Sequence, residues 1–161
     1  MTLYSFDTNS WITGWRYYDI RSFSDVWAGI DDAIDRGKVR CVKMVHEDLG
    51  AKDDGIFRWV AKREGKLVYP TDDVLMGAVR RVLAVHPNLF HPDSRKSASD
   101  PWVIALALAC DGVVVCEEAK YQGPNYRWAK IPTACCDLDV RCIDFPEFIA
   151  EQHWTFARDR F

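Results

Sequence analysis

The stretch DPWVIALALACDGVVVCEE, residues 100–118, decides the fold class. Its first part, residues 101–110, is apolar on all sides of a helix, and such a helix is buried within a fold. The run VVVC after Gly112 reads as a buried strand. A buried helix that leads directly into a buried strand is typical of a parallel sheet covered by helices.

The same alternation extends in both directions along the chain. Strands are predicted at residues 3–6, 38–45, 113–116 and 139–144. Helices are predicted at residues 22–37, 72–85, 100–110, 131–139 and 146–154, and two helical stretches are predicted within residues 47–63, divided at Gly55. Alternating strands and helices predict an α/β fold with helices on both faces of a parallel sheet. With no linker or repeat, we expect one domain over residues 1–161.

The composition indicates a globular domain and argues against a membrane-spanning protein. Of the 161 residues, 48% are hydrophobic and 28% charged, as in ordinary globular domains, and no apolar run reaches membrane length. No leader segment is visible, so we expect a cytoplasmic protein without membrane contact. The six cysteines form no C-x-x-C pair, which favours buried reduced thiols over a zinc site. The net charge of −3 argues against non-specific coating of nucleic acid.

Acidic residues fall where parallel strands end. Asp7 follows the first strand, Glu47 lies in or near the first turn after the second strand, and Glu118 follows the third. Because right-handed crossovers bring the carboxyl ends of parallel strands to one edge, these three acids should meet. A helix antiparallel to its strand begins at that same edge, so Asp100 joins them.

Each acid also has a structural interpretation. Asp7 in SFDTNSWI suits a turn, and Asp100 before Pro101 suits a helix cap. Glu47 suits the dipole of its helix, and Glu117 or Glu118 suits a solvated strand end. These interpretations do not explain why four acids should converge on one edge.

A converging set of carboxylates has chemical consequences. Two of them about 4 Å apart repel by roughly 4 kcal/mol at an effective dielectric constant near 20. They must take up protons or hold a cation, and oxygen ligands without His or Cys select Mg²⁺ or Mn²⁺. A metal ion held this way suits phosphodiester hydrolysis.

At these residues the sequence resembles the PIN-domain ribonucleases. The matching pieces, in the family's order, are FDTNSWI around Asp7, VHEDL around Glu47, SASDPWVIALALA around Asp100 and VVVCEE around Glu118. They span nearly the whole chain. The tail IPTACCDLDVRCIDFPEFI looks like that of one PIN subgroup whose described relatives are VapC-type toxins.

The resemblance implies a three-layer α/β/α sandwich around a parallel sheet of about five strands. It also implies Mg²⁺- or Mn²⁺-dependent cleavage of single-stranded or loop RNA, often by a toxin held by an antitoxin protein, with a homodimer possible. The residues it implies as metal ligands and catalytic groups are Asp7, Glu47, Asp100 and Glu118. Those it implies as supporting hydrogen-bonding groups are Thr8, Asn9 and Ser99.

One departure from the family concerns the last acid. Many PIN proteins have Thr-x-Asp where this chain has Cys116-Glu117-Glu118, so Glu117 is an alternative to Glu118. Spacing from the strand favours Glu118. The longer side chain leaves open whether one metal ion binds or two.

Several alternatives stay open at this stage. Arg95 and Lys96 before Asp100 could hold RNA phosphates or form a solvated loop. The aromatic residues Trp11, Trp15, Tyr17 and Tyr18 could stack bases, but core packing is favoured. A covalent role for Asp7 in phosphoryl transfer is weaker, because Asn9 stands where a second Asp is usual. A catalytically silent PIN scaffold that binds another protein is the alternative from a different class.

Overall fold

The computed structural model describes residues 1–89, 98–118 and 128–155. The strands are β1 (Tyr4–Phe6), β2 (Val39–Arg40), β3 (Val113–Val115) and β4 (Arg141–Ile143). They form one parallel sheet in the order β2-β1-β3-β4. The expected α/β class and parallel sheet are confirmed. The described residues contain four strands rather than about five.

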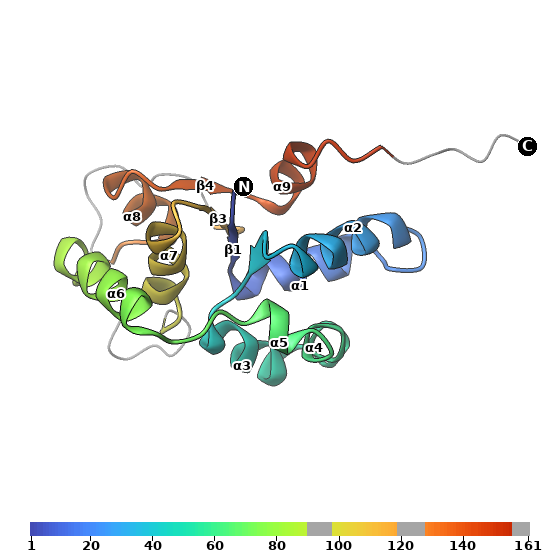
Figure 1. The fold of residues 1–161 in the computed structure, drawn as a ribbon, viewed down its shortest axis with the longest axis horizontal. Coiled ribbons are helices and arrows are strands. Elements are labelled where there is room, and N and C mark those ends of the chain that lie inside the picture. The colour runs from blue at the N-terminus through green and yellow to red at the C-terminus, as the bar shows by residue number, and fades with distance from the viewer. Residues whose placement is uncertain (90–97, 119–127, 156–161) are drawn as a thin grey trace, which may run out of the picture.

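Helices flank this sheet. The first group is α1 (Thr8–Tyr17), α2 (Ser24–Asp35), α3 (Lys43–Lys52), α4 (Asp54–Ala61) and α5 (Glu64–Leu67). The second group is α6 (Asp73–Val85), α7 (Asp100–Ala109), α8 (Ile131–Asp137) and α9 (Phe145–Glu151). Figure 1 shows α6, α7 and α8 on one side of β1 and α1, α2 and α9 on the other, with α3, α4 and α5 below its end.

Side-chain alternation along β1 explains the layers. Tyr4 and Phe6 both pack their rings edge-on against Phe148 of α9, at centroid distances of 4.9 Å. Ser5, between them, donates to the carbonyl oxygen of Val103 in α7 at 2.8 Å. Successive strand side chains point to opposite faces, so β1 is buried between two helical layers, as in an α/β/α sandwich.

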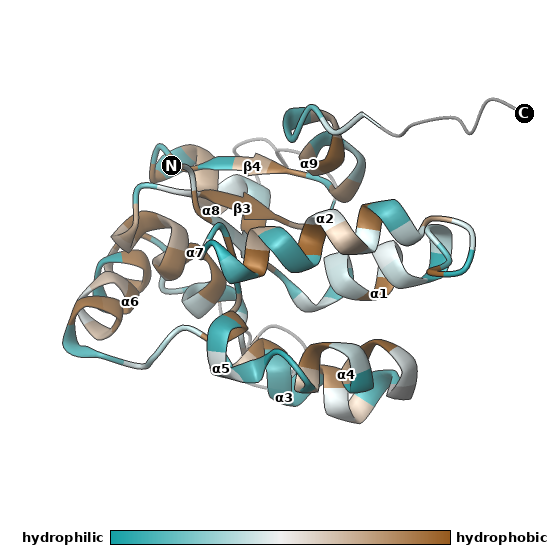
Figure 2. Cartoon of the chain, turned by 45° about the vertical axis from the view of Figure 1, so that its right-hand side comes forward, coloured by the Kyte–Doolittle hydropathy of each residue, from teal (hydrophilic) through white to brown (hydrophobic). Residues whose placement is uncertain are grey.

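The buried helix and strand predicted at residues 100–118 are present. All three β3 residues are buried, and α7 is buried over most of its length. Figure 2 shows the hydrophobic colouring of α7 and β3, and α7 packs closely against α6. None of the described helices has the length and apolar character needed to cross a membrane.

Aromatic residues fill the layer formed by α1, α2 and α9. Trp11 and Trp27 are fully or almost fully buried, and Trp27 lies 5.0 Å from Trp59 between ring centroids. The favoured core role is therefore confirmed for Trp11, whereas Tyr17 is 69% exposed. All six cysteines are free thiols; Cys41, Cys116 and Cys135 are buried, Cys110 and Cys142 are partly buried, and Cys136 is exposed.

One predicted strand is much shorter than expected. Residues 38–45 were predicted as a strand, but only Val39 and Arg40 pair with β1. The next residue, Cys41, instead forms a parallel bridge with Val68 on the other side of β2. The chain turns into α3 at Lys43, four residues before the predicted helix start.

Candidate functional site

Asp7 stands between β1 and α1 and is 4% exposed. It occupies the N-cap position, yet its side chain makes no capping hydrogen bond within α1. Burial raises its pKa to about 7, with the charge of Glu118 adding to the rise, against a hydrogen bond from the Thr8 backbone. Asp7 therefore lacks the bond to the second or third helical residue that a cap would make, and its hydrogen bond from the Thr8 backbone does not outweigh the effect of burial.

Hydrogen bonds from the start of α1 hold Asp7 beside the end of β3. The Asp7 backbone N–H donates to the carbonyl oxygen of Val115 at 3.0 Å, and the Ser10 hydroxyl donates to the same oxygen at 2.8 Å. Ser10 is fully buried. The sequence predicted no role for it, because a serine in a first helical turn carries no signal of a bond to a distant strand.

Asp100 is the first residue of α7 and is 6% exposed. The cap position belongs to Ser99, so Asp100 is not the helix cap. Burial raises its pKa to about 9, followed by the repulsive charges of Asp7, Glu118 and Asp48. Pro101 fits next to it because the first helical turn needs no backbone N–H there.

The two glutamates after β3 diverge. Glu117 accepts a hydrogen bond from the backbone N–H of Phe145 at 2.9 Å, at the start of α9. Glu118 accepts one from the backbone N–H of Ile131 at 3.0 Å, at the start of α8. Of these two, Glu118 is the one whose charge raises the pKa of both Asp7 and Asp100. The expected choice of Glu118 over Glu117 agrees with this placement.

The expected position of Glu47 needs correction. Its side chain is 61% exposed and lies 3.9 Å from the Lys43 ammonium, on the surface of α3. The neighbouring Asp48 is half-buried, accepts a long 3.5 Å hydrogen bond from the Thr8 hydroxyl, and raises the pKa of both buried acids. Because α3 begins at Lys43, the side of the helix that faces Asp7 carries Asp48.

We call Asp7, Asp48, Asp100 and Glu118 the acid cluster. The expected supporting residues differ in placement: Thr8 and Ser99 are buried beside it, whereas Asn9 is exposed. Arg95 and Lys96 lie outside the described residues. Sequence reasoning missed Lys52, at the end of α3, whose positive charge lowers the pKa of both Asp7 and Asp100.

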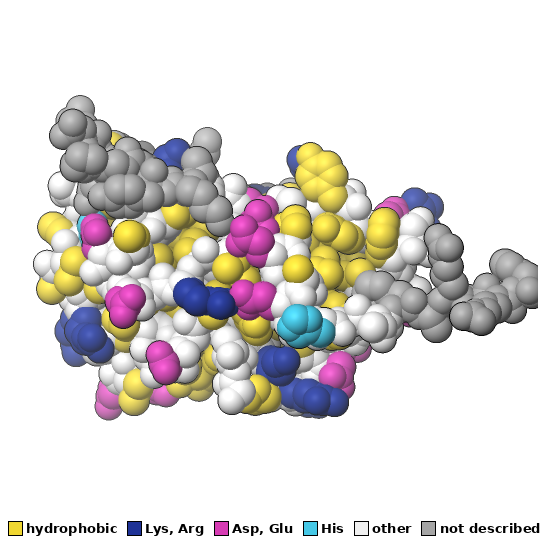
Figure 3. Space-filling view, turned by 90° about the horizontal axis from the view of Figure 1, so that it is seen from above, with side chains coloured by type: hydrophobic (Ala, Val, Ile, Leu, Met, Phe, Trp, Pro, Cys, Tyr) yellow, Lys and Arg dark blue, Asp and Glu magenta, His cyan; other side chains and the backbone are white. Residues whose placement is uncertain are grey.

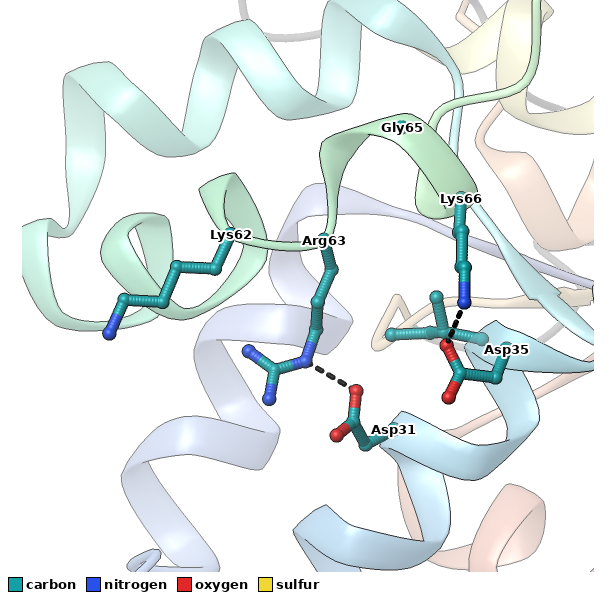
Figure 4. Close-up of a pocket in the computed structure, with 7 residues that line it drawn as sticks. Asp31, Asp35, Lys62, Arg63, Gly65 and Lys66 are labelled. Carbon is teal, nitrogen blue, oxygen red and sulfur yellow. Dashed lines mark hydrogen bonds and ion pairs between the residues drawn. The ribbon is translucent and has the colours of Figure 1, made fainter.

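In a second charged region of this protein, each acidic side chain has a basic partner. A hollow of about 430 Å³ between α2 and the α4–α5 segment contains both signs of charge. Arg63 contacts Asp31 at 2.6 Å, and Lys66 contacts Asp35 at 3.0 Å (Figure 4). These acids are neutralised by direct partners, so the hollow is explained by structural ion pairs.

The acid cluster is different, because its two buried carboxyls form no ion pair with any other described residue. Its donors are carboxylate oxygens, which suit Mg²⁺ or Mn²⁺. Within the three described ranges, no three His, Cys, Asp or Glu side chains are gathered into a preformed metal-ligand group. Asp7, Asp48, Asp100 and Glu118 therefore suit a divalent cation for two reasons: their donor atoms are oxygens, and no ion pair compensates the two buried carboxyls.

Comparison with known proteins assigns the family. Residues 4–156 match the sequence model of a family described as a domain of unknown function, DUF4411. This match covers nearly the whole chain, so the protein belongs to that family. A comparison with curated proteins found no match.

Proposed function

We propose that this member of the DUF4411 family is a metal-dependent endoribonuclease that cleaves single-stranded or loop RNA. The observation that supports the proposal is the burial of two carboxyls, Asp7 and Asp100, at the carboxyl edge of a parallel sheet. They are close enough that the charge of Asp7 raises the pKa of Asp100. Ligand sites in open parallel α/β sheets lie at this edge. The resemblance to PIN-domain ribonucleases comes from the same residues.

Burial of these acids is unfavourable for the isolated fold. A carboxylate taken from water without a partner either shifts its pKa or requires a compensating cation. Here the pKa values of Asp7 and Asp100 rise to about 7 and 9, so both groups tend to hold protons near neutral pH without a cation. Such a site has a function that offsets its cost, and binding of Mg²⁺ or Mn²⁺ is the simplest one.

The residues divide the work of RNA cleavage between them. Asp7, Asp48, Asp100 and Glu118 would hold the metal ion, and the chemistry that the ion would supply is the activation of water and the stabilisation of charge on the phosphate. Asp7 and Asp100 would form the buried part of the ligand set, since both side chains are packed within the protein. Thr8 orients Asp48 through its hydroxyl, and the Ile131 backbone N–H orients Glu118.

Charge on the rest of the molecule fits a substrate held locally. The net charge is −3, and on the face in Figure 3 acidic and basic side chains are interspersed. Long-range attraction of RNA would need a continuous basic surface. RNA binding by this protein would therefore depend on contacts near the acid cluster, in the cytoplasm where such substrates are found.

We further propose that a partner protein restrains this activity, as an antitoxin restrains a VapC-type toxin. The outer surface of α6 exposes Val74 and Val85, which are 61% and 51% exposed. A hollow of about 560 Å³ is lined by apolar residues of α3, α6 and α7, including Met44 and Trp102. Exposed apolar surface of this kind suits protein contact, in a complex with an antitoxin or in a homodimer. The same surface favours a silent, protein-binding scaffold as the second candidate function.

Cleavage of RNA by the purified protein tests the proposal. Wild type should cut a mixture of single-stranded and hairpin RNAs with Mg²⁺ or Mn²⁺ and stop in EDTA. Asp7→Asn should lower the rate at least about a hundredfold, the scale seen when transition-state charge loses a stabilising group. Asp35→Asn, which removes an equivalent charge from a surface ion pair, should leave the rate unchanged.

Two outcomes would contradict the proposal. Cleavage that survives EDTA, or that Asp7→Asn and wild type show equally, would indicate a contaminating nuclease. The absence of any cleavage by a preparation that binds Mn²⁺ would favour the silent scaffold.

A further inference from the structure

We propose that Lys52 binds the phosphate of the RNA strand at the acid cluster, with its ammonium donating to a non-bridging oxygen of the phosphodiester to be cut. This inference rests on the proposed ribonuclease function and adds the residue that accommodates the substrate's own negative charge. Neither the family resemblance nor the sequence pattern assigns a role to Lys52.

Helix geometry puts Lys52 on the side of α3 that faces the site. Residues four apart lie on the same face of an α-helix, and Lys52 follows Asp48 by four residues within α3. Asp48 lies close to the start of α1, since its carboxylate is 3.5 Å from the hydroxyl of Thr8, the residue next to Asp7. The face of α3 that carries Asp48 and Lys52 therefore lies against the segment that carries Asp7.

The Lys52 ammonium is available for a ligand. Its side chain is exposed, and it forms no ion pair or hydrogen bond with another described residue. Two lysines that flank it in sequence do have partners: Lys43 pairs with Glu47 and Lys66 with Asp35. Lys52 is thus a cation near several acids that none of them takes up as a direct partner.

A cation at this position would reduce the repulsion between the RNA phosphate and the acid cluster. A phosphodiester carries a negative charge and would approach four carboxyl groups, so repulsion opposes binding unless positive charge is close by. A flexible lysine at the rim can follow a phosphate during binding, as a point charge with three donors.

A purely electrostatic role is the rival explanation. Lys52 could act only on the acids, by keeping them ionised for a metal ion, without touching the substrate. In that case its loss would weaken metal binding, and a higher metal concentration would restore full activity. A phosphate contact would instead leave a defect in RNA binding that no metal concentration repairs.

Two measurements on three variants separate these roles. The variants are Lys52→Met, Lys52→Arg, which keeps the charge, and Lys43→Met as a control on the same helix. The first measurement is the affinity of each protein for a fluorescein-labelled single-stranded RNA in EDTA, as a function of KCl concentration. The second is kcat/KM for RNA cleavage at saturating Mn²⁺.

We expect Lys52→Met to bind RNA more weakly than Lys43→Met, with the slope of log affinity against log salt less negative by about 0.7, the loss of one phosphate contact. Its kcat/KM at saturating Mn²⁺ should fall at least about tenfold, as expected for a lost charged hydrogen bond. Lys52→Arg should recover most of both losses.

The outcomes also distinguish this inference from the proposed function. Equal RNA affinity and salt slope in Lys52→Met and Lys43→Met would overturn the phosphate contact, whether or not the protein cleaves RNA. A defect in kcat/KM that disappears with more Mn²⁺ would overturn it in favour of the electrostatic role. Weaker, less salt-dependent RNA binding by Lys52→Met in a protein that shows no cleavage would support Lys52 as a phosphate contact and refute the nuclease.

Discussion

At the scale of single residues, the unusual feature is that two aspartates are buried at positions where apolar side chains are usual. Asp7 and Asp100 are each less than a tenth exposed, and the cluster around them adds two more acids. A sequence selected for stability alone would replace such groups, since buried charge without a partner is costly. Retained charge of this kind is typical of functional sites.

The raised pKa values predict how stability depends on pH. Below about pH 4, both carboxyls are protonated in the folded and the unfolded chain, so their burial carries no charge penalty. As the pH rises, the unfolded chain releases these protons first, while folded Asp7 and Asp100 retain theirs to about pH 7 and 9. The metal-free protein should therefore lose stability between about pH 4 and 9 on account of these groups.

Asp100→Asn tests this, because asparagine imitates the protonated acid. In EDTA the variant should be more stable than wild type, with a gap that widens with pH and reaches at least about 1–2 kcal/mol at pH 8. Denaturant unfolding at pH 5 and pH 8 would measure the gap, with Asp35→Asn as the surface control. A gap that is the same at both pH values would show that Asp100 does not carry a raised pKa.

The choice between two adjacent acids gives a second residue-scale prediction. Asp48→Asn should lower metal-dependent RNA cleavage by about tenfold or more, because it removes a charge that acts on both buried carboxyls. Glu47→Gln should leave cleavage unchanged, since that side chain lies on the exposed surface beside Lys43. Initial rates at equal Mn²⁺ concentration would compare them, and the reverse ranking would restore Glu47 to the site.

Glu47 and Asp48 also show which part of the site could not be predicted from the sequence. The rule for strand ends predicted that Asp7 and Glu118 lie at one edge of the sheet, and the direction of the buried helix added Asp100; the strands and the helix behind this prediction are present, and the joint role of the three acids stays a prediction. The rule failed for Glu47, because each residue turns an α-helix by about 100° and the register of α3 was unknown. An Asp in the next position could not be preferred without the true start of the helix.

At the scale of elements, pairing partners set lengths that the local sequence does not contain. KVRCVKMV has the apolar content of a long strand, but β2 pairs with β1 only over Val39 and Arg40, and Cys41 then bridges Val68 before α3 begins. The start of the helix predicted at residues 72–85 was more reliable, because Asp72 caps it by accepting a hydrogen bond from the Leu75 backbone N–H. Caps are local interactions, so the sequence alone predicts them better.

Two helical glycines give an element-scale prediction. Gly14 in α1 faces Phe145 of α9, and a Cβ there would overlap its fully buried ring. Gly77 in α6 has open space around the same position. We expect Gly14→Ala to destabilise the fold by about 1–3 kcal/mol through overpacking, and Gly77→Ala to stabilise it by about 0.5–1 kcal/mol through helix propensity. Denaturant unfolding would measure both, and stabilisation by Gly14→Ala would contradict the close packing of α1 on α9.

At the scale of the whole molecule, the residues that stabilise the fold and the residues of the candidate site lie in different places. One helical layer is packed with aromatic rings around Trp27 and Phe145, and the other is built on the apolar α7. The sheet between them delivers its strand ends to a single edge, where the acids collect. Fold class was readable from the sequence because hydrophobic patterns report on layers, whereas the electrostatic coupling among Asp7, Asp48 and Asp100 depends on their spatial arrangement.

The most direct test of the whole account is the binding of Mn²⁺ to the protein, measured by isothermal titration calorimetry at pH 7. We predict that wild type and Glu47→Gln bind Mn²⁺ alike, that Asp48→Asn binds it more weakly, and that Asp7→Asn combined with Asp100→Asn abolishes binding while the fold is retained. Equal binding by wild type and the double variant, or no binding by wild type, would contradict the claim that the acid cluster is a metal site.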